Sequence, residues 1–213
     1  MVVTVGTITY GAGTGIGDSN YTLEHTVATG TKVLVIGVAV SWASGNGATS
    51  AKWNTTPATL AVSRTGSGRF AGILYVVNPV VGTYNIVVHD DNDAGSSGGP
   101  QIYAANLSGD VGTASPVGDT HSQLGVDVAY TFQGDVGAQF DIFFGDTFAT
   151  VDVASTTIFE SVAIGTDKCA ASYRLHSGTD FTTDHSADPA GDFYAGAEFK
   201  NGNDLVTLQI INV

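Results

Sequence analysis

The sequence predicts an all-β fold, a two-sheet antiparallel β-sandwich with little or no helix, and three observations lead to this prediction. Segments rich in Val, Ile, Thr and aromatic residues recur about every 8 to 15 residues with turn residues between them, as in sandwiches of short strands. No window of eleven or more residues carries the i, i+3, i+4, i+7 apolar repeat of a surface helix. Of the 20 acidic residues, 17 are Asp, which favours turns, and three are Glu, which favours helices.

Candidate strands follow one another along the whole chain, and no shift in composition separates two parts. We therefore expect residues 1–213 to form a single β-sandwich domain. The predicted strands are residues 2–10, 21–27, 32–42, 50–53, 58–63, 70–77, 83–89, 101–107, 126–132, 139–144, 157–164, 170–176, 193–199 and 205–213.

Apolar patterning distinguishes central strands from surface strands. Residues 33–40 and 73–77 are almost continuously apolar, which predicts central strands covered on both faces. Residues 84–89 partly alternate, which is typical of a strand with one face in water. The dipeptide Asn201-Gly202 predicts a terminal hairpin, and the glycine-rich residues 11–17 are predicted to form a flexible turn.

Charge, cysteine content and hydropathy argue against several classes of protein. Seven Lys and Arg against 20 Asp and Glu give a net charge of −13, which repels phosphate backbones and argues against a nucleic-acid partner. Cys169 is the only cysteine, so the expectation is a buried thiol and no intramolecular disulfide. The N-terminal residues lack the features of a signal peptide, and the longest apolar stretch is far shorter than the ~20 residues of a membrane span. A soluble protein without membrane insertion is expected.

A resemblance covers residues 33–88, about a quarter of the chain. It rests on the strand VLVIGVAVSW, the segments SAKW and PATL, and the stretch GILYVVNPVVGTYNIVV. This pattern resembles β-sandwich modules of phage and environmental proteins, in which a similar strand is followed by two hairpins. Where those modules have Gly-Gly in the first hairpin, this chain has Asn54-Thr55-Thr56. The resemblance implies a jelly-roll-like sandwich used in virion or surface structures, and it carries over no catalytic residue.

The acidic segment after residue 89 is the densest group of hard oxygen ligands. Asp90, Asp91 and Asp93 are the candidate calcium ligands, because Ca²⁺ favours carboxylate and amide oxygens. The segment lacks the spacing of an EF-hand, and the alternative is an acidic turn in solvent. Apart from calcium, no cofactor is expected.

A second group of ligand-type residues lies in a predicted irregular loop, where spacing alone fixes no coordination geometry. A transition-metal site and a solvated loop are both open interpretations. The group consists of His176, Asp180, Asp184, His185, Asp188 and Asp192.

Motifs of known enzyme classes are missing from the sequence. There is no Gly-x-Ser-x-Gly elbow, and no histidine stands in a triad motif. Glu160 and Glu198 stand alone in the sequence rather than as the carboxylate pair of a β-sandwich glycosidase. We assign no catalytic residue and expect the protein not to be an enzyme.

The expected function is that of a virion structural protein, a capsid decoration, cement, tail or fibre-associated subunit. It would be made in the host cytoplasm and act through interfaces with copies of itself and with other virion proteins. The alternative is a calcium-assisted carbohydrate-binding module that stacks a cell-surface glycan on Trp42 or Trp53. Core packing is the competing interpretation of these aromatic residues, and exposure of the tryptophans distinguishes the two.

Overall fold

The computed structural model describes residues 2–17, 19–41, 49–66, 68–90, 99–124, 128–132, 136–145, 151–152, 154–164, 167–185 and 193–202. Within these residues there is no helix, and so none that could cross a membrane. The strands are β1 (Val3–Ala12), β2 (Thr14–Gly17), β3 (Asn20–Val27), β4 (Val33–Ser41), β5 (Thr49–Trp53), β6 (Thr56–Pro57), β7 (Thr59–Gly66), β8 (Arg69–Val77), β9 (Gly82–Asp90), β10 (Gln101–Gly109), β11 (Val117–Leu124), β12 (Val128–Phe132), β13 (Val136–Gly145), β14 (Thr156–Ile164), β15 (Asp167–Ser177), β16 (Phe181–His185) and β17 (Phe193–Lys200).

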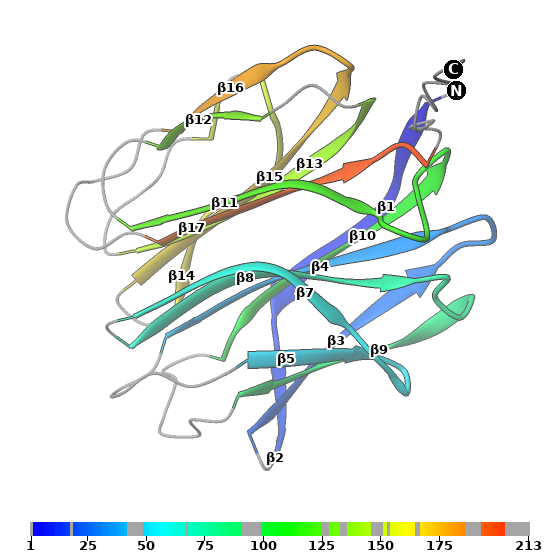
Figure 1. The fold of residues 1–213 in the computed structure, drawn as a ribbon. Helices are drawn as coiled ribbons and strands as arrows, with labels where there is room; N and C mark the ends of the chain where they lie inside the picture. The colour runs from blue at the N-terminus through cyan, green and yellow to red at the C-terminus, as the bar shows by residue number, and fades with distance from the viewer. Residues whose placement is uncertain are drawn as a thin grey trace, which may run out of the picture.

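Three five-stranded antiparallel sheets are stacked on one another (Figure 1). The central sheet has the strand order β1-β10-β4-β8-β7. The lower sheet, β2-β3-β9-β5-β6, covers one of its faces, and the upper sheet, β11-β17-β13-β15-β14, covers the other. The two-stranded pair β12-β16, here called the outer pair, lies beyond the upper sheet (Figure 1).

Two hydrophobic cores separate the three sheets, and successive residues of β4 point alternately into them. Val33 and Val35 pack in the core shared with the upper sheet. Leu34 and Ile36 pack in the core shared with the lower sheet. Because side chains alternate along a strand, a strand between two cores must be apolar at every position. The prediction of central strands covered on both faces is confirmed for β4, and β8 follows the same alternation.

Gly37 interrupts the apolar run of β4 because an aromatic ring occupies the place of its side chain. Tyr103 of β10 is its register partner, and a Cβ atom on Gly37 would overlap the Tyr103 ring. The ring in turn stacks on Phe140 of the upper sheet, with 6.3 Å between centroids. The missing side chain of Gly37 therefore gives Tyr103 its place in the upper core.

The all-β sandwich prediction is confirmed, and the stack holds one more large sheet than the two predicted. Each predicted strand from residues 2–10 to 193–199 matches a strand of the structure within a few residues. The predicted flexible turn at residues 11–17 is wrong, because β1 continues to Ala12 and β2 pairs with β3. The predicted strand 205–213, and with it the terminal hairpin, lies outside the described residues.

Polar clusters tie the central sheet to both neighbours. Arg69 of β8 donates to both carboxylate oxygens of Asp167 in β15, at 2.8 and 3.2 Å, and the Ser41 hydroxyl donates to the same carboxylate at 2.9 Å. On the other side, His25 of β3 lies 2.9 Å from Thr9 Oγ1 and 3.1 Å from Asn106 Oδ1. These bonds join strands that no backbone ladder connects.

Candidate functional site

The predicted calcium ligands are only partly described. Asp90 ends β9, is buried, and its backbone N–H donates to the Ser19 carbonyl at 3.0 Å. Asp91 and Asp93 lie outside the described residues. The described part of the chain contains no group of three or more His, Cys, Asp or Glu residues able to hold a metal ion. The calcium site therefore remains a prediction.

The second predicted ligand group is divided between strands. The prediction of an irregular loop is wrong for residues 181–185, which form β16 and pair with β12. His176 lies in β15, where its Nε2 atom is 3.2 Å from Glu198 Oε1. Asp188 and Asp192 fall outside the described residues. Of the described members of this group, His176 contacts the carboxylate of Glu198 in the upper sheet.

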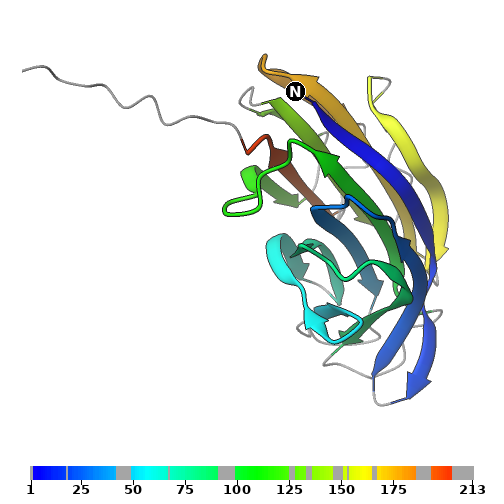
Figure 2. The ribbon, with the colours of Figure 1, turned by 90° about the vertical axis from the view of Figure 1, so that its right-hand side faces the viewer.

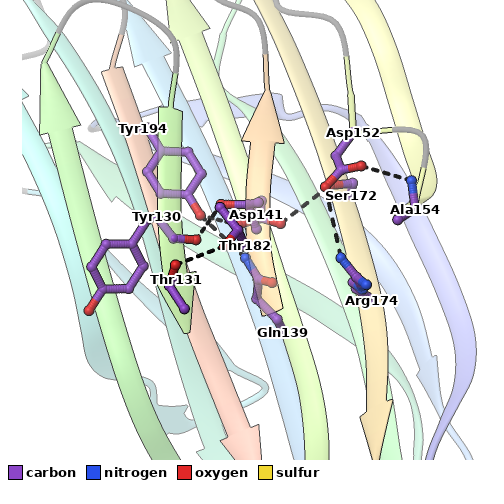
Figure 3. A network of polar contacts seen from close by, with 11 residues as sticks. Tyr130, Thr131, Gln139, Asp141, Asp152, Ala154, Ser172, Arg174, Thr182 and Tyr194 are labelled. Atoms are coloured by element: carbon purple, nitrogen blue, oxygen red, sulfur yellow. Dashed lines mark hydrogen bonds and ion pairs between the residues drawn. The ribbon is translucent and has the colours of Figure 1, made fainter. Parts of the chain in front are cut away.

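Buried polar side chains line the face of the upper sheet that points away from the central sheet (Figure 3). Asp141 of β13 is at its centre and is fully buried. Tyr194 and Gln139 both donate to Oδ1 of Asp141, the latter at 2.5 Å, and Ser172 Oγ lies 3.4 Å from Oδ2. The neighbours Ala138 and Phe140 point the other way, into the upper core.

Glu198 is the second buried carboxylate of this face. It is the register partner of Gln139, so it lies diagonally across the sheet from Asp141. Its Oε2 atom accepts the backbone N–H of Asp119 at 3.2 Å, and His176 lies beside its Oε1 atom. Although Glu198 stands alone in the sequence, the fold gives it a histidine and a backbone donor as neighbours and places it diagonally across the sheet from Asp141.

Aromatic residues of the outer pair pack on this polar face. The Phe181 ring lies 4.7 Å from the His176 ring and 4.8 Å from the guanidinium carbon of Arg174. Tyr130 stacks on His121 of β11, with 4.0 Å between ring centroids. The outer pair thus withdraws the polar face from water, where a buried polar group without a hydrogen-bond partner is costly.

Burial affects the ionisation of a tyrosine in this network. Burial, with a further contribution from the Asp141 charge, raises the pKa of Tyr194 well above its ordinary value of 10.0. The hydroxyl keeps its proton and donates to the carboxylate. Asp141 has hydrogen-bond partners at both carboxylate oxygens, whereas Glu198 accepts a hydrogen bond at Oε2 and lies beside His176 at Oε1. The sequence did indicate that Gln139 and Asp141 share one face of β13, because they alternate with apolar residues there.

The aromatic platform proposed for glycan stacking is not present at Trp53. Its side chain is fully buried in the lower core, its Nε1–H donates to the Val80 carbonyl at 3.0 Å, and Tyr84 packs edge-on against it. Trp42 lies outside the described residues. Core packing is therefore the role of the one described tryptophan.

Two cavities are lined by different elements of the described part of the chain. The first, of about 420 Å³, lies beside the end of β17 and is here called the lysine pocket. The second, of about 350 Å³, lies on the lower sheet between β3, β5 and β9. The lysine pocket is lined by Lys32, Asp110, Val111, Gly112, Thr113, Ala114, Ser115, Lys200, Asn201 and Gly202.

Comparison with known proteins gives no relative: no family model, no curated protein and no solved structure matches this chain. The resemblance to phage and environmental sandwich modules therefore stays at the level of the hydrophobic pattern in residues 33–88.

Proposed function

We propose that this protein is a structural subunit that works through protein–protein interfaces, as a decoration, cement, tail or fibre-associated protein of a virion does. The observation that carries the proposal is the presence of large exposed apolar side chains on three edge strands. Tyr10 lies on β1, Leu60 on β7 and Leu124 on β11, and each has about half of its surface exposed, 52%, 49% and 47%.

Edge strands can supply both backbone hydrogen bonds and apolar surface to an interface. Their outer backbone N–H and C=O groups have no partner within the sheet, so they can pair with a strand of another chain. β1 is ten residues long and runs along the side of the stack that faces the viewer in Figure 2. An apolar side chain beside such an edge adds area that an interface can bury.

The buried polar clusters support the same proposal. The carboxylates of Asp141, Glu198 and Asp167 are buried and bound by groups of the same chain. Such groups stabilise and specify the stack. The proposed partners are copies of the chain itself and other virion proteins, and the proposed location is the virion.

Light scattering coupled to size exclusion, over a range of protein concentrations, tests the proposal. We expect the wild-type chain to form a defined oligomer, with particles visible by negative-stain imaging at high concentration. The separate variants Tyr10→Asp, Leu60→Asp and Leu124→Asp place a charge at each edge, and at least one should block association without lowering the melting temperature. Thr179→Asp, in an exposed turn, is the matched control. A wild-type chain that stays monomeric throughout and forms no particles would overturn the proposal.

A further inference from the structure

We propose that the lysine pocket is a binding site for carboxylate groups, with a carboxylate of a second copy of this chain as the ligand in the assembly. The second part rests on the proposed function, whereas carboxylate binding by the pocket does not. Nothing in the sequence brings the two lysines together: Lys32 precedes β4, and Lys200 ends β17.

Backbone hydrogen bonds hold both lysines in place. The Lys32 N–H donates to the Leu107 carbonyl at 2.8 Å. The Lys200 carbonyl accepts the N–H of Gly112 at 2.9 Å, and the Lys200 N–H donates to the Pro116 carbonyl at 2.9 Å. Both lysines therefore line one cavity from backbone that is held in place by hydrogen bonds.

Neither ammonium group is neutralised within the described part of the chain. Lys32 and Lys200 make no ion pair and no side-chain hydrogen bond with a described residue, whereas Arg69 and Arg174 are paired with Asp167 and Asp152. Asp110 is the acid of the pocket lining, so two cations face one carboxylate. The lining carries a net charge of +1 in a chain whose net charge is −13.

The size and chemistry of the pocket fit a carboxylate. A volume of about 420 Å³ is within the range of about 300–1,000 Å³ found for small-molecule sites. The hydroxyls of Thr113 and Ser115 add hydrogen-bond donors beside the ammonium groups. The acidic field of the whole chain disfavours long polyanions, which must approach many charges at once, more than a single carboxylate.

A second copy is the source that the charges favour. With 20 acidic and seven basic residues, two copies repel each other unless a basic site on one meets an acidic side chain on the other. Two of the seven basic residues line this one cavity. A contact of this kind is heterologous, because a pocket on one copy receives a different surface of the next.

The test uses the double variant Lys32→Gln/Lys200→Gln, with Lys52→Gln/Lys168→Gln as a control that removes the same charge from two exposed lysines elsewhere. Citrate is the soluble probe, titrated by calorimetry with sodium chloride adjusted to constant ionic strength. We expect citrate to bind the wild type and the control, and to bind the pocket variant about tenfold more weakly or not at all. Unchanged melting temperatures show that the variants fold.

Light scattering of the same proteins identifies the source of the carboxylate. Loss of association in the pocket variant alone, with inhibition of wild-type association by citrate, supports a second copy. Citrate binding that depends on the two lysines, with unchanged association or with a monomeric wild type, keeps the pocket as a carboxylate site and assigns its ligand to a free small acid. If neither citrate binding nor association depends on the two lysines more than on the control pair, the inference is overturned.

Discussion

His25 shows how one buried residue makes stability depend on pH. Asn106 uses its Nδ2 to donate to the Thr26 carbonyl at 2.9 Å, so its Oδ1 must accept from His25 Nε2. When the imidazole is neutral, its Nδ1 atom therefore accepts from the Thr9 hydroxyl. Burial lowers the pKa of His25 below its ordinary value of 6.5, in agreement with this tautomer.

The lowered pKa predicts that His25 makes the stability of the folded chain sensitive to acid. The unfolded chain binds a proton on this histidine at a higher pH than the folded chain does, so stability falls as pH drops below 6.5. The loss is at most about 1.4 kcal/mol per pH unit and ends below the folded-state pKa. Urea unfolding between roughly pH 7 and roughly pH 5 should show a steeper loss in the wild type than in His25→Gln.

Comparison with a second histidine variant isolates the effect of His25. His89→Gln replaces another half-buried histidine, on β9, and is the matched control for the loss of an imidazole. Equal slopes for the wild type and His25→Gln would mean that His25 takes up its proton equally well in the folded chain.

At this same scale, the sequence predicted the role of some residues and not of others. The apolar run around Gly37 indicated a central strand, but no pattern in it indicates Tyr103, whose ring fills the space above the glycine. Asp141 and Glu198 each occupy an outward position of an apolar strand, where solvent is the default expectation. Their burial comes from the outer pair, which the sequence of their own strands does not reveal.

Among the elements, β8 and β15 are joined by a side-chain bond rather than by a ladder. The guanidinium group of Arg69 donates to both carboxylate oxygens of Asp167. Both side chains are largely buried, with exposures of 13% and 6%. Removing one partner leaves a buried charge without its counterion. We expect Asp167→Ala to cost about 3 kcal/mol in the free energy of unfolding.

A double-mutant cycle separates this bond from the loss of packing. Arg69→Met/Asp167→Ala should be more stable than Asp167→Ala alone, because the double variant leaves no unpaired charge. The control pair is Arg174 and Asp152, whose atoms are 3.9 Å apart and partly exposed, and its loss should cost under about 1 kcal/mol. Urea unfolding measures both. If Asp167→Ala costs no more than the control, the bond does not hold the two sheets together.

Two of the four strands that were not predicted from the sequence were missed for the same physical reason. β11 and β16, with the sequences VGDTHSQL and FTTDH, are rich in polar and small residues and lack an apolar alternation. Their pairing partners, β17 and β12, determine their extended form. Strand propensity depends on the neighbouring strand as much as on the residues themselves, which is why isolated sequence reasoning finds central strands more easily than edge strands.

For the whole molecule, the continuous apolar pattern of residues 33–40 is not the pattern that a two-sheet sandwich requires. In a two-sheet sandwich each sheet has one face on the core and one face in water, so its strands alternate. A strand that is apolar at every position needs a cover on both faces, which a three-sheet stack supplies. The number of sheets could not be predicted because nothing local specifies which later strands form the second cover.

The three-sheet arrangement predicts a particular order of local opening. Amides of β4 and β10 are enclosed by both cores, so they should exchange with solvent only on global unfolding. The outer pair has one ladder and should open at a much lower free energy. Hydrogen exchange followed by mass spectrometry should therefore give the slowest exchange in β4 and β10 and much faster exchange in β12 and β16.

Matched core substitutions test whether the outer sheets open independently of each other. Ile86→Val removes one methylene group from the lower core and Ile142→Val removes one from the upper core, each at a cost of about 0.5–1.5 kcal/mol. If the cores open separately, the first variant should speed exchange mainly in β3, β5 and β9, and the second mainly in β13, β15 and β17. Both should affect β4 equally, because its amides require the loss of both cores. Uniform acceleration of every strand by either variant would instead show that the three sheets unfold as one cooperative unit.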